Sequence, residues 1–198
     1  MAASANGGYV STGLIVAGLV ILLVVVLGLW AIVTYNRLVR QRNQVQASWA
    51  QIDVQLKRRY DLIPNLVETV RGYASHERGT LDAVIQARNS AINTASQSPA
   101  VRAEAENALT QTLGRLFALA EAYPNLKANE NFLGLQNELS ATEDKISYAR
   151  QFYNSAVQTF NTSVQSVPAN IVAGMGGFRV LNLFEAVGAE RGPVQVRF

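Results

Sequence analysis

The sequence contains no cysteine and a single histidine, His76. The absence of cysteine excludes disulfides, thiolate metal sites and cysteine nucleophiles. A Ser-His-Asp arrangement would have to use His76, which lies in a polar segment beside Glu77 and Arg78. A di-iron site in a helical bundle needs two Glu-x-x-His pairs, but Tyr73 stands three residues before the histidine. We therefore interpret His76 as a solvated turn residue.

Acidic side chains do not form a convincing catalytic pair either. Glu104 and Glu106, like Glu143 and Asp144, are too close together on a helix to converge on one point, so we expect them to lie on solvated faces. No catalytic residue, metal, cofactor or small-molecule substrate is predicted. The sequence indicates a protein that is not an enzyme.

Charge is missing from the whole N-terminal part, because the first charged residue is Arg37. Within that part, every residue from Leu14 to Val33 is apolar or glycine. As a helix this run reaches about 30 Å, the thickness of a bilayer's hydrocarbon core. A cleaved signal peptide would need a basic leader and a shorter apolar run. We therefore predict an uncleaved transmembrane helix, with Trp30 and Tyr35 as interfacial aromatics.

Basic residues gather directly after this span, at Arg37, Arg40 and Arg42. The positive-inside rule then places the N-terminus outside and the main domain in the cytoplasm. The chain up to Tyr60 carries six basic and one acidic side chain, net +5, whereas the remainder has eleven and thirteen, net −2. This distribution favours an anionic lipid surface. We expect no nucleic-acid partner, since the run 57–59 is flanked by aspartates that should pair within the same helix.

Glycine and proline are absent from Leu29 to Ile63. Apolar residues recur there at gaps of three and four, which predicts one long amphipathic helix continuous with the span. Pro64 should kink it. The predicted apolar stripe consists of Val45, Trp49, Ile52, Leu56, Tyr60, Ile63, Val67, Val70 and Ala74.

Two shorter helices and a second long one should complete the bundle. The first short helix follows a turn near residue 75, and the second begins at Ser98-Pro99 and ends near Tyr123-Pro124. The last helix has a coiled-coil spacing and should run antiparallel to the first. Their predicted core positions are Leu81, Val84, Ile85, Ile92, Val101, Ala105, Leu109, Leu113, Leu116, Ala120, Phe132, Leu135, Leu139, Thr142, Ile146, Ala149, Tyr153, Ala156, Phe160 and Ser163, with Phe152 adding bulk beside the last seam.

Pro168 should end the helical part and begin a glycine-rich tail. Its glycines, Gly188 and Gly192 included, are interspersed with apolar residues that are uncommon in disordered segments. We therefore expect the tail to dock on its own bundle, on a neighbouring copy or on the membrane. The candidates for an oligomer contact are Phe178, Leu183 and Phe184.

Two long stretches resemble the LemA family. They are VQASWAQIDVQLKRRYDLIPNLVETVRGYASHE, residues 45–77, and AYPNLKANENFLGLQNELSATEDKISYARQFYNSAVQTFNTSVQSVPANIVAGMGGF, residues 122–178. The resemblance implies a bacterial membrane protein with an all-helical domain. It also extends to the MamQ-like branch from magnetosome-forming bacteria, which is implicated in building an intracellular membrane.

The predicted fold is all-α. It comprises a leader (1–13), a transmembrane helix (14–34), a LemA-like bundle of about four helices (35–167) and the tail (168–198). For function we expect a scaffold in the bacterial inner membrane that binds the lipid bilayer, forms homo-oligomers and organises or remodels the membrane. The alternative is an adaptor whose bundle binds another membrane protein, such as a protease or a signalling partner.

Overall fold

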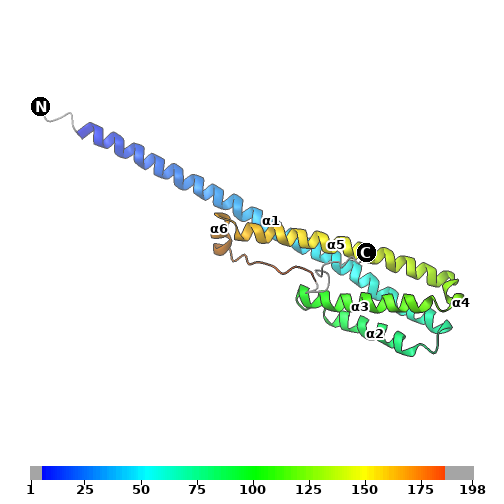
Figure 1. Cartoon of the computed structure of the whole chain (residues 1–198). Helices are drawn as coiled ribbons and strands as arrows, with labels where there is room; N and C mark the ends of the chain where they lie inside the picture. Colours follow the sequence, from blue (N-terminus) through cyan, green and yellow to red (C-terminus); the bar gives the residue numbers. More distant parts are fainter. Residues whose placement is uncertain (1–5, 186–198) are drawn as a thin grey trace, which may run out of the picture. The chain divides into compact units, whose positions relative to one another are not determined.

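The computed structural model describes residues 6–185, and their side chains from residue 13 onward. Within this range the chain is all-α and has no strand, which confirms the predicted fold class (Figure 1). The helices are α1 (Asn6–Tyr73), α2 (Arg78–Asn93), α3 (Pro99–Ala120), α4 (Pro124–Lys127), α5 (Glu130–Gln165) and α6 (Ala169–Met175). The helix α1 begins inside the predicted leader.

The chain divides into two compact units, and each of the two long helices contributes to both. Among the described residues, the anchor unit comprises residues 6–43 together with Phe160–Val180. The bundle unit comprises Gln44–Thr159 and residues 181–185. The anchor unit therefore contains the apolar part of α1, the end of α5 and all of α6, and the bundle unit contains the remaining helices.

The helix α1 passes through Pro64 and ends at Tyr73, so the proline does not terminate it. A proline has no backbone N–H, and its position in the helix leaves the carbonyl oxygen of Tyr60, four residues earlier, without its usual donor. Arg88 of α2 replaces that donor, because its Nε donates a hydrogen bond to the Tyr60 carbonyl oxygen at 2.7 Å. The proline is thus accommodated by a side chain from another helix.

In the bundle unit, α5 runs antiparallel to α1, as predicted. Trp49 contacts Tyr153 with ring centroids 5.1 Å apart, and further along α1 Arg58 pairs with Glu138, which lies earlier in α5. The predicted stripe of α1 faces the core: all of its members are buried except Trp49, which is partly buried. The predicted seam of α5 is buried or partly buried throughout, whereas Phe152, expected beside the seam, is 48% exposed.

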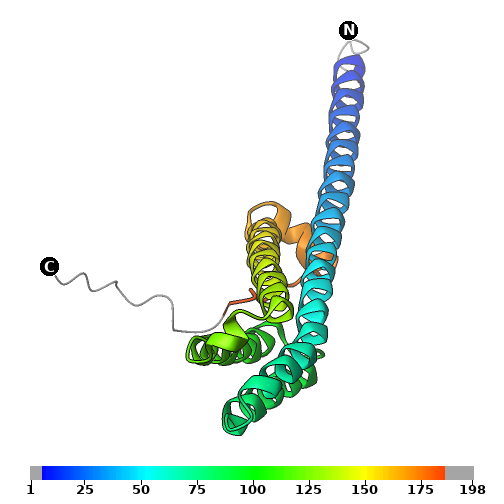
Figure 2. The ribbon, with the colours of Figure 1, turned by 90° about the vertical axis from the view of Figure 1, so that its right-hand side faces the viewer.

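The helices α2 and α3 lie side by side in the bundle unit (Figures 1 and 2). Ser98 stands at the N-cap of α3 and Pro99 at its first position, as expected. Two core predictions were wrong by one residue, because Val101 and Ile92 are exposed while their neighbours Arg102 and Ala91 are buried. The spacing of apolar residues cannot show that an arginine occupies a core position, because this depends on an acidic partner elsewhere in the chain.

The prediction that Pro168 ends the helical part was wrong, since α6 begins at the next residue. The segment after α6 turns at Gly177, whose φ of +68° favours glycine. Gly176 is closely packed, because a Cβ on it would lie 2.6 Å from the Phe178 ring and 3.1 Å from the Tyr35 ring. Gly188 and Gly192 lie outside the described residues.

Candidate interaction surfaces

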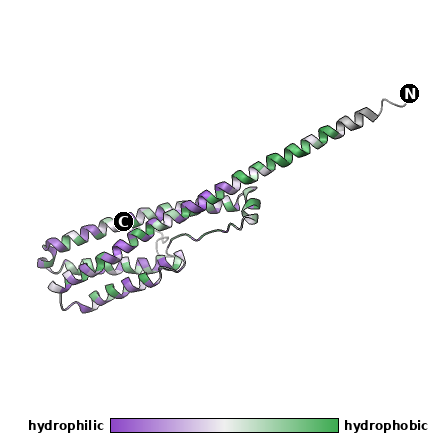
Figure 3. Cartoon of the chain, turned by 180° about the vertical axis from the view of Figure 1, so that it is seen from behind, coloured by the Kyte–Doolittle hydropathy of each residue, from purple (hydrophilic) through white to green (hydrophobic). Residues whose placement is uncertain are grey.

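One helix within the described part of the chain, α1, is long and apolar enough to cross a membrane. In Figure 3 the N-terminal part of α1 is mostly green (hydrophobic) with no purple, whereas the helices of the bundle unit mix green with purple (hydrophilic). The side chains from Leu14 to Leu29 are all exposed. This pattern indicates a single-pass anchor, because lipid can cover an apolar surface that water cannot.

The predicted membrane-surface residues Arg37, Arg40 and Arg42 are all exposed and follow directly on the span. Over these six positions the helix turns by more than a full turn, so the three arginines point in different directions around α1. Leu38, which lies between them in the sequence, is buried. The arginines thus form a basic collar on α1, and their role at a lipid surface stays a prediction.

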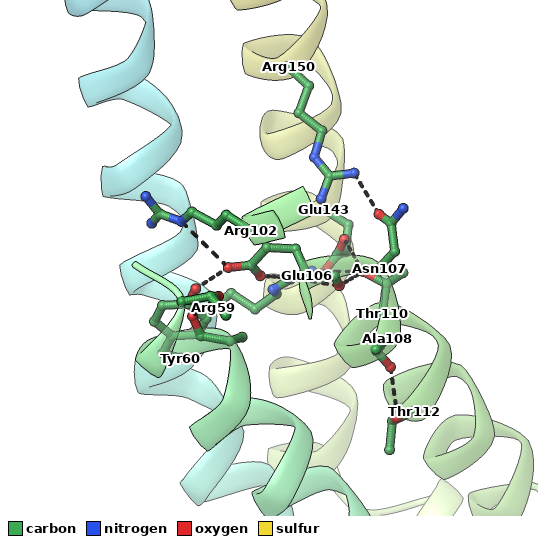
Figure 4. A network of polar contacts seen from close by, with 12 residues as sticks. Arg59, Tyr60, Arg102, Glu106, Asn107, Ala108, Thr110, Thr112, Glu143 and Arg150 are labelled. Atoms are coloured by element: carbon green, nitrogen blue, oxygen red, sulfur yellow. Dashed lines mark hydrogen bonds and ion pairs between the residues drawn. The ribbon is translucent and has the colours of Figure 1, made fainter. Parts of the chain in front are cut away.

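A network of charged residues lies inside the bundle unit (Figure 4). Arg59 of α1 is fully buried and forms ion pairs with Glu106 of α3, also fully buried, and with Glu143 of α5 at 2.6 Å. The Tyr60 hydroxyl donates a hydrogen bond to Glu106 as well. Arg59 therefore links the three helices α1, α3 and α5 through two carboxylates.

Arg102 extends this network toward the surface. Its guanidinium lies 2.5 Å from a carboxylate oxygen of Asp53, and it also stacks over the Trp49 ring, 5.2 Å from the centroid. Its Nε lies 4.0 Å from Glu106. The network as a whole places two guanidinium groups against three carboxylates, so its buried charges are compensated.

The surroundings of Tyr60 shift its titration. Burial, followed by the hydrogen bond to Glu106 and the negative charge of that carboxylate, raises the pKa of the Tyr60 hydroxyl well above its ordinary value. The phenol therefore stays protonated and remains a hydrogen-bond donor at neutral pH. Because Arg59 and Glu106 are both fully buried, a substrate in solution cannot reach them. This geometry fits a role in holding the helices together.

The network corrects two expectations. Glu106 was expected on a solvated face and is fully buried, although its neighbour Glu104 is exposed as predicted. Asp53 was expected to pair with Lys57 within α1, but it pairs with Arg102 of α3. Neither contact has a signal in the local sequence, because each depends on which helices become neighbours. Among the described residues, no group of three or more His, Cys, Asp or Glu side chains could hold a metal ion.

An exposed apolar groove runs between α1 and α5 on the surface of the bundle unit. It has a volume of about 670 Å³. Three large side chains on it are exposed: Val54 (63%), Tyr148 (72%) and Phe152 (48%). The groove is lined by Ala50, Gln51, Val54, Gln55, Lys145, Tyr148, Ala149 and Phe152. Contiguous exposed apolar residues of this kind mark interaction sites, so this groove is the strongest candidate on the bundle unit.

The predicted oligomer-contact residues have partners in their own chain. Phe178 is 8% exposed and contacts Tyr35 and Phe160 in the anchor unit. Phe184 is 2% exposed and contacts Trp49 and Arg150 in the bundle unit. Leu183 is partly buried. A contact with a neighbouring copy through these side chains stays a prediction, and it would first require the two phenylalanines to leave their sites.

Hydrogen bonds from two side chains of α5 to the backbone hold the segment around Phe184. The Asn154 amide accepts a hydrogen bond from the Phe184 backbone N–H at 2.8 Å and donates one to its carbonyl oxygen at 3.3 Å. The Tyr153 hydroxyl donates to the carbonyl oxygen of Asn182 at 3.0 Å. Two adjacent side chains of α5 therefore hold an extended segment by its backbone, which residue periodicity alone does not indicate.

The apolar span and the helical bundle define a class: a membrane-anchored all-α protein. The chain belongs to the LemA family, whose model matches residues 48–198. The resemblance noted in the two long stretches is thereby confirmed. Family membership and relatives together indicate a membrane-associated protein.

Three relatives show the extent of the similarity. Protein LemA of Metamycoplasma hominis is 29% identical over 158 residues, covering 79% of this chain and 71% of that protein. Magnetosome protein MamQ 2 of Paramagnetospirillum magneticum is 24% identical over 184 residues, covering 81% of this chain and 68% of its own length. Magnetosome protein MamQ of Magnetospirillum gryphiswaldense is 23% identical with the same coverage.

Proposed function

We propose that this protein is a non-enzymatic, membrane-anchored scaffold whose copies associate through the groove between α1 and α5. The observation that carries the proposal is the exposure of Val54, Tyr148 and Phe152 along that groove. Without a partner, the exposure of these apolar side chains to water would not stabilise the bundle.

The groove has the features of a self-complementary surface. Tyr148 and Phe152 are four residues apart on α5 and so form an aromatic ridge on one face of the helix. Ala50 and Ala149 provide small side chains beside it. A two-fold contact would let the ridge of each copy fill the space over the alanines of the other. Anchoring in one bilayer raises the effective concentration of copies and favours such a contact.

The basic collar supports an orientation for the scaffold. With Arg37, Arg40 and Arg42 directly after the span and no charged residue before it, the N-terminus would lie outside and the bundle in the cytoplasm, at the inner membrane. Anionic headgroups would then meet the collar, at about 1 kcal/mol for each cation near the surface. The likeness to magnetosome proteins supports a role in organising or remodelling the membrane.

The test compares two valine variants of the full chain in lipid vesicles. Val54→Lys places a charge in the groove, and Val101→Lys places one on an exposed valine of α3 outside it. Single-molecule photobleaching should count two or more copies per complex for the wild type and Val101→Lys, and mainly one for Val54→Lys. Cryo-electron microscopy of the same vesicles would show whether loss of association also removes any change in vesicle shape.

A wild type that remains monomeric at every protein-to-lipid ratio would refute self-association. The adaptor alternative predicts that outcome together with one stoichiometric membrane-protein partner, co-purified by the wild type and lost in Val54→Lys. Equal association by both valine variants would show that copies meet through another surface.

A further inference from the structure

We propose that α6 is a second membrane contact, which inserts its exposed apolar side chains into the bilayer interface beside the transmembrane span. The proposal concerns the anchor unit alone. It requires the anchor but not the self-association proposed above, so the two proposals can fail separately.

The first observation is the side chains that α6 leaves exposed. Ile171 and Met175 are four residues apart on α6 and are exposed by 61% and 86%, and Val167, just before the helix, is exposed by 81%. The other face of α6 is covered, with Val172 and Ala173 buried. A short helix with one face buried against its own chain and large apolar side chains on the other has the pattern of an interfacial segment.

The second observation is the absence of charge. No charged residue occurs from Gln151 to Phe178, and the next one is the exposed Arg179. In α1 the uncharged part likewise ends at an arginine, Arg37. Both segments of the anchor unit thus change from uncharged to basic, as expected of segments that leave a bilayer on the side of its anionic headgroups.

The third observation sets the depth of α6 along the span. A groove of about 320 Å³ is lined by Ala31, Ile32 and Tyr35 of α1 together with Val172, Met175 and Gly176. Ala31 and Ile32 belong to the apolar run that crosses the bilayer, and Tyr35 lies where an interfacial aromatic is expected. Figures 1 and 2 both show α6 beside α1 in the anchor unit. The exposed face of α6 is therefore continuous with the lipid-facing surface of the span.

Packing holds α6 at this depth. The Phe178 ring contacts Tyr35 with centroids 5.5 Å apart and Phe160 with centroids 6.3 Å apart. Gly176 permits this arrangement, since a larger residue would clash with Phe178 and Tyr35. Lipid is the occupant that these positions indicate for the exposed face, because the same chain's membrane helix forms the other wall of the groove.

The absence of cysteine allows a direct test with single-cysteine variants of the full chain. Met175→Cys would carry an environment-sensitive fluorophore in vesicles of zwitterionic and anionic phospholipid, with few protein copies per vesicle. Quenching would be measured with iodide in the water and with a nitroxide near the glycerol end of the acyl chains. Val101→Cys in the bundle unit, outside the groove, is the water-exposed control, and Leu22→Cys in the span is the lipid-exposed control.

The label at residue 175 should be quenched by the lipid nitroxide severalfold more than the label at residue 101, and should be protected from iodide. Ile171→Cys, on the same face, should show the same lipid quenching and the same protection from iodide. This result would exclude an effect specific to the label at residue 175. A residue 175 label that matches residue 101 in both assays would overturn the proposal. Protection from iodide without lipid quenching would also overturn it, because protein and not lipid would then cover α6. Repeating the assay with Val54→Lys keeps the result independent of self-association.

Discussion

The helix α1 belongs to both units, but its side chains have opposite surroundings in the two. In the anchor unit, α1 presents large apolar side chains outward and carries no charge before Arg37. In the bundle unit, α1 places Arg59 in the interior, at 0% exposure, where two carboxylates meet it. Lipid as a solvent permits the first arrangement, and compensation by neighbouring helices permits the second.

The spacing of apolar residues describes the anchor unit well, but it does not fully describe the bundle unit. The anchor unit is held by aromatic packing around Phe178 and by the tight fit of Gly176. The bundle unit adds a connected set of charges to its apolar core. Damage should therefore differ in kind: loss of a charge should harm the bundle unit most, and added volume should harm the anchor unit most.

The largest effect is expected from Glu106→Ala. Removal of this carboxylate leaves the buried guanidinium of Arg59 without one of its partners, which should lower the free energy of unfolding by about 3–5 kcal/mol. Urea unfolding of the detergent-solubilised chain, followed by Trp49 fluorescence in a Trp30→Phe background, measures it. Glu104→Ala, on an exposed position two residues away, should change stability by less than about 0.5 kcal/mol. Equal effects of the two variants would contradict the role of the network.

The next largest effect should come from added volume in the anchor unit. Gly176→Ala forces a methyl group against the rings of Phe178 and Tyr35 and should cost about 1–3 kcal/mol. Gly174→Ala is the matched control, since a Cβ there meets nothing within 4 Å and alanine favours the helix by about 0.5–1 kcal/mol. Hydrogen exchange of the α6 amides should accelerate in the first variant and slow in the second. Faster exchange in both would argue against the tight contact at Gly176.

A smaller effect should follow from the donor that compensates for Pro64. Arg88→Met removes the hydrogen bond to the Tyr60 carbonyl oxygen and should cost about 1–2 kcal/mol. In a Pro64→Ala background the new backbone N–H can reach the same oxygen, so the cost should fall by about 1 kcal/mol. The double-mutant cycle is measured by urea unfolding. Additive effects would show that Arg88 does not substitute for the missing donor.

The smallest effect, confined to alkaline pH, concerns Tyr60. Its pKa is raised in the folded state, so its contribution to stability is fully present below the unfolded pKa of about 10. That contribution is lost as the pH rises from there through the folded pKa, because only the unfolded chain releases the proton at first. The Tyr60→Phe variant should therefore lose less stability than the wild type above about pH 10. Parallel stability curves for the two proteins would exclude this linkage.

Several features could be read from residue patterns because they depend on local sequence. The uncharged apolar run of α1, the stripe from Val45 to Ala74 and the start of α3 at Ser98-Pro99 each reflect helical periodicity or capping preferences. The family resemblance also rested on two continuous stretches. In all of these cases the information lies within a few turns of helix.

Other features depend on which segments become neighbours, so they arise only when the helices pack together. The burial of Glu106 requires Arg59 and Tyr60 of another helix, and the groove exposing Val54 requires α1 beside α5. The course of the chain after Pro168 likewise depends on the aromatic contacts of Phe178. The anchor, the helices and most apolar core positions could be predicted from the amino-acid sequence, because each follows from periodicity along one segment. The charge network and the placement of α6 arise from contacts far apart in the chain, whose energies no local pattern records.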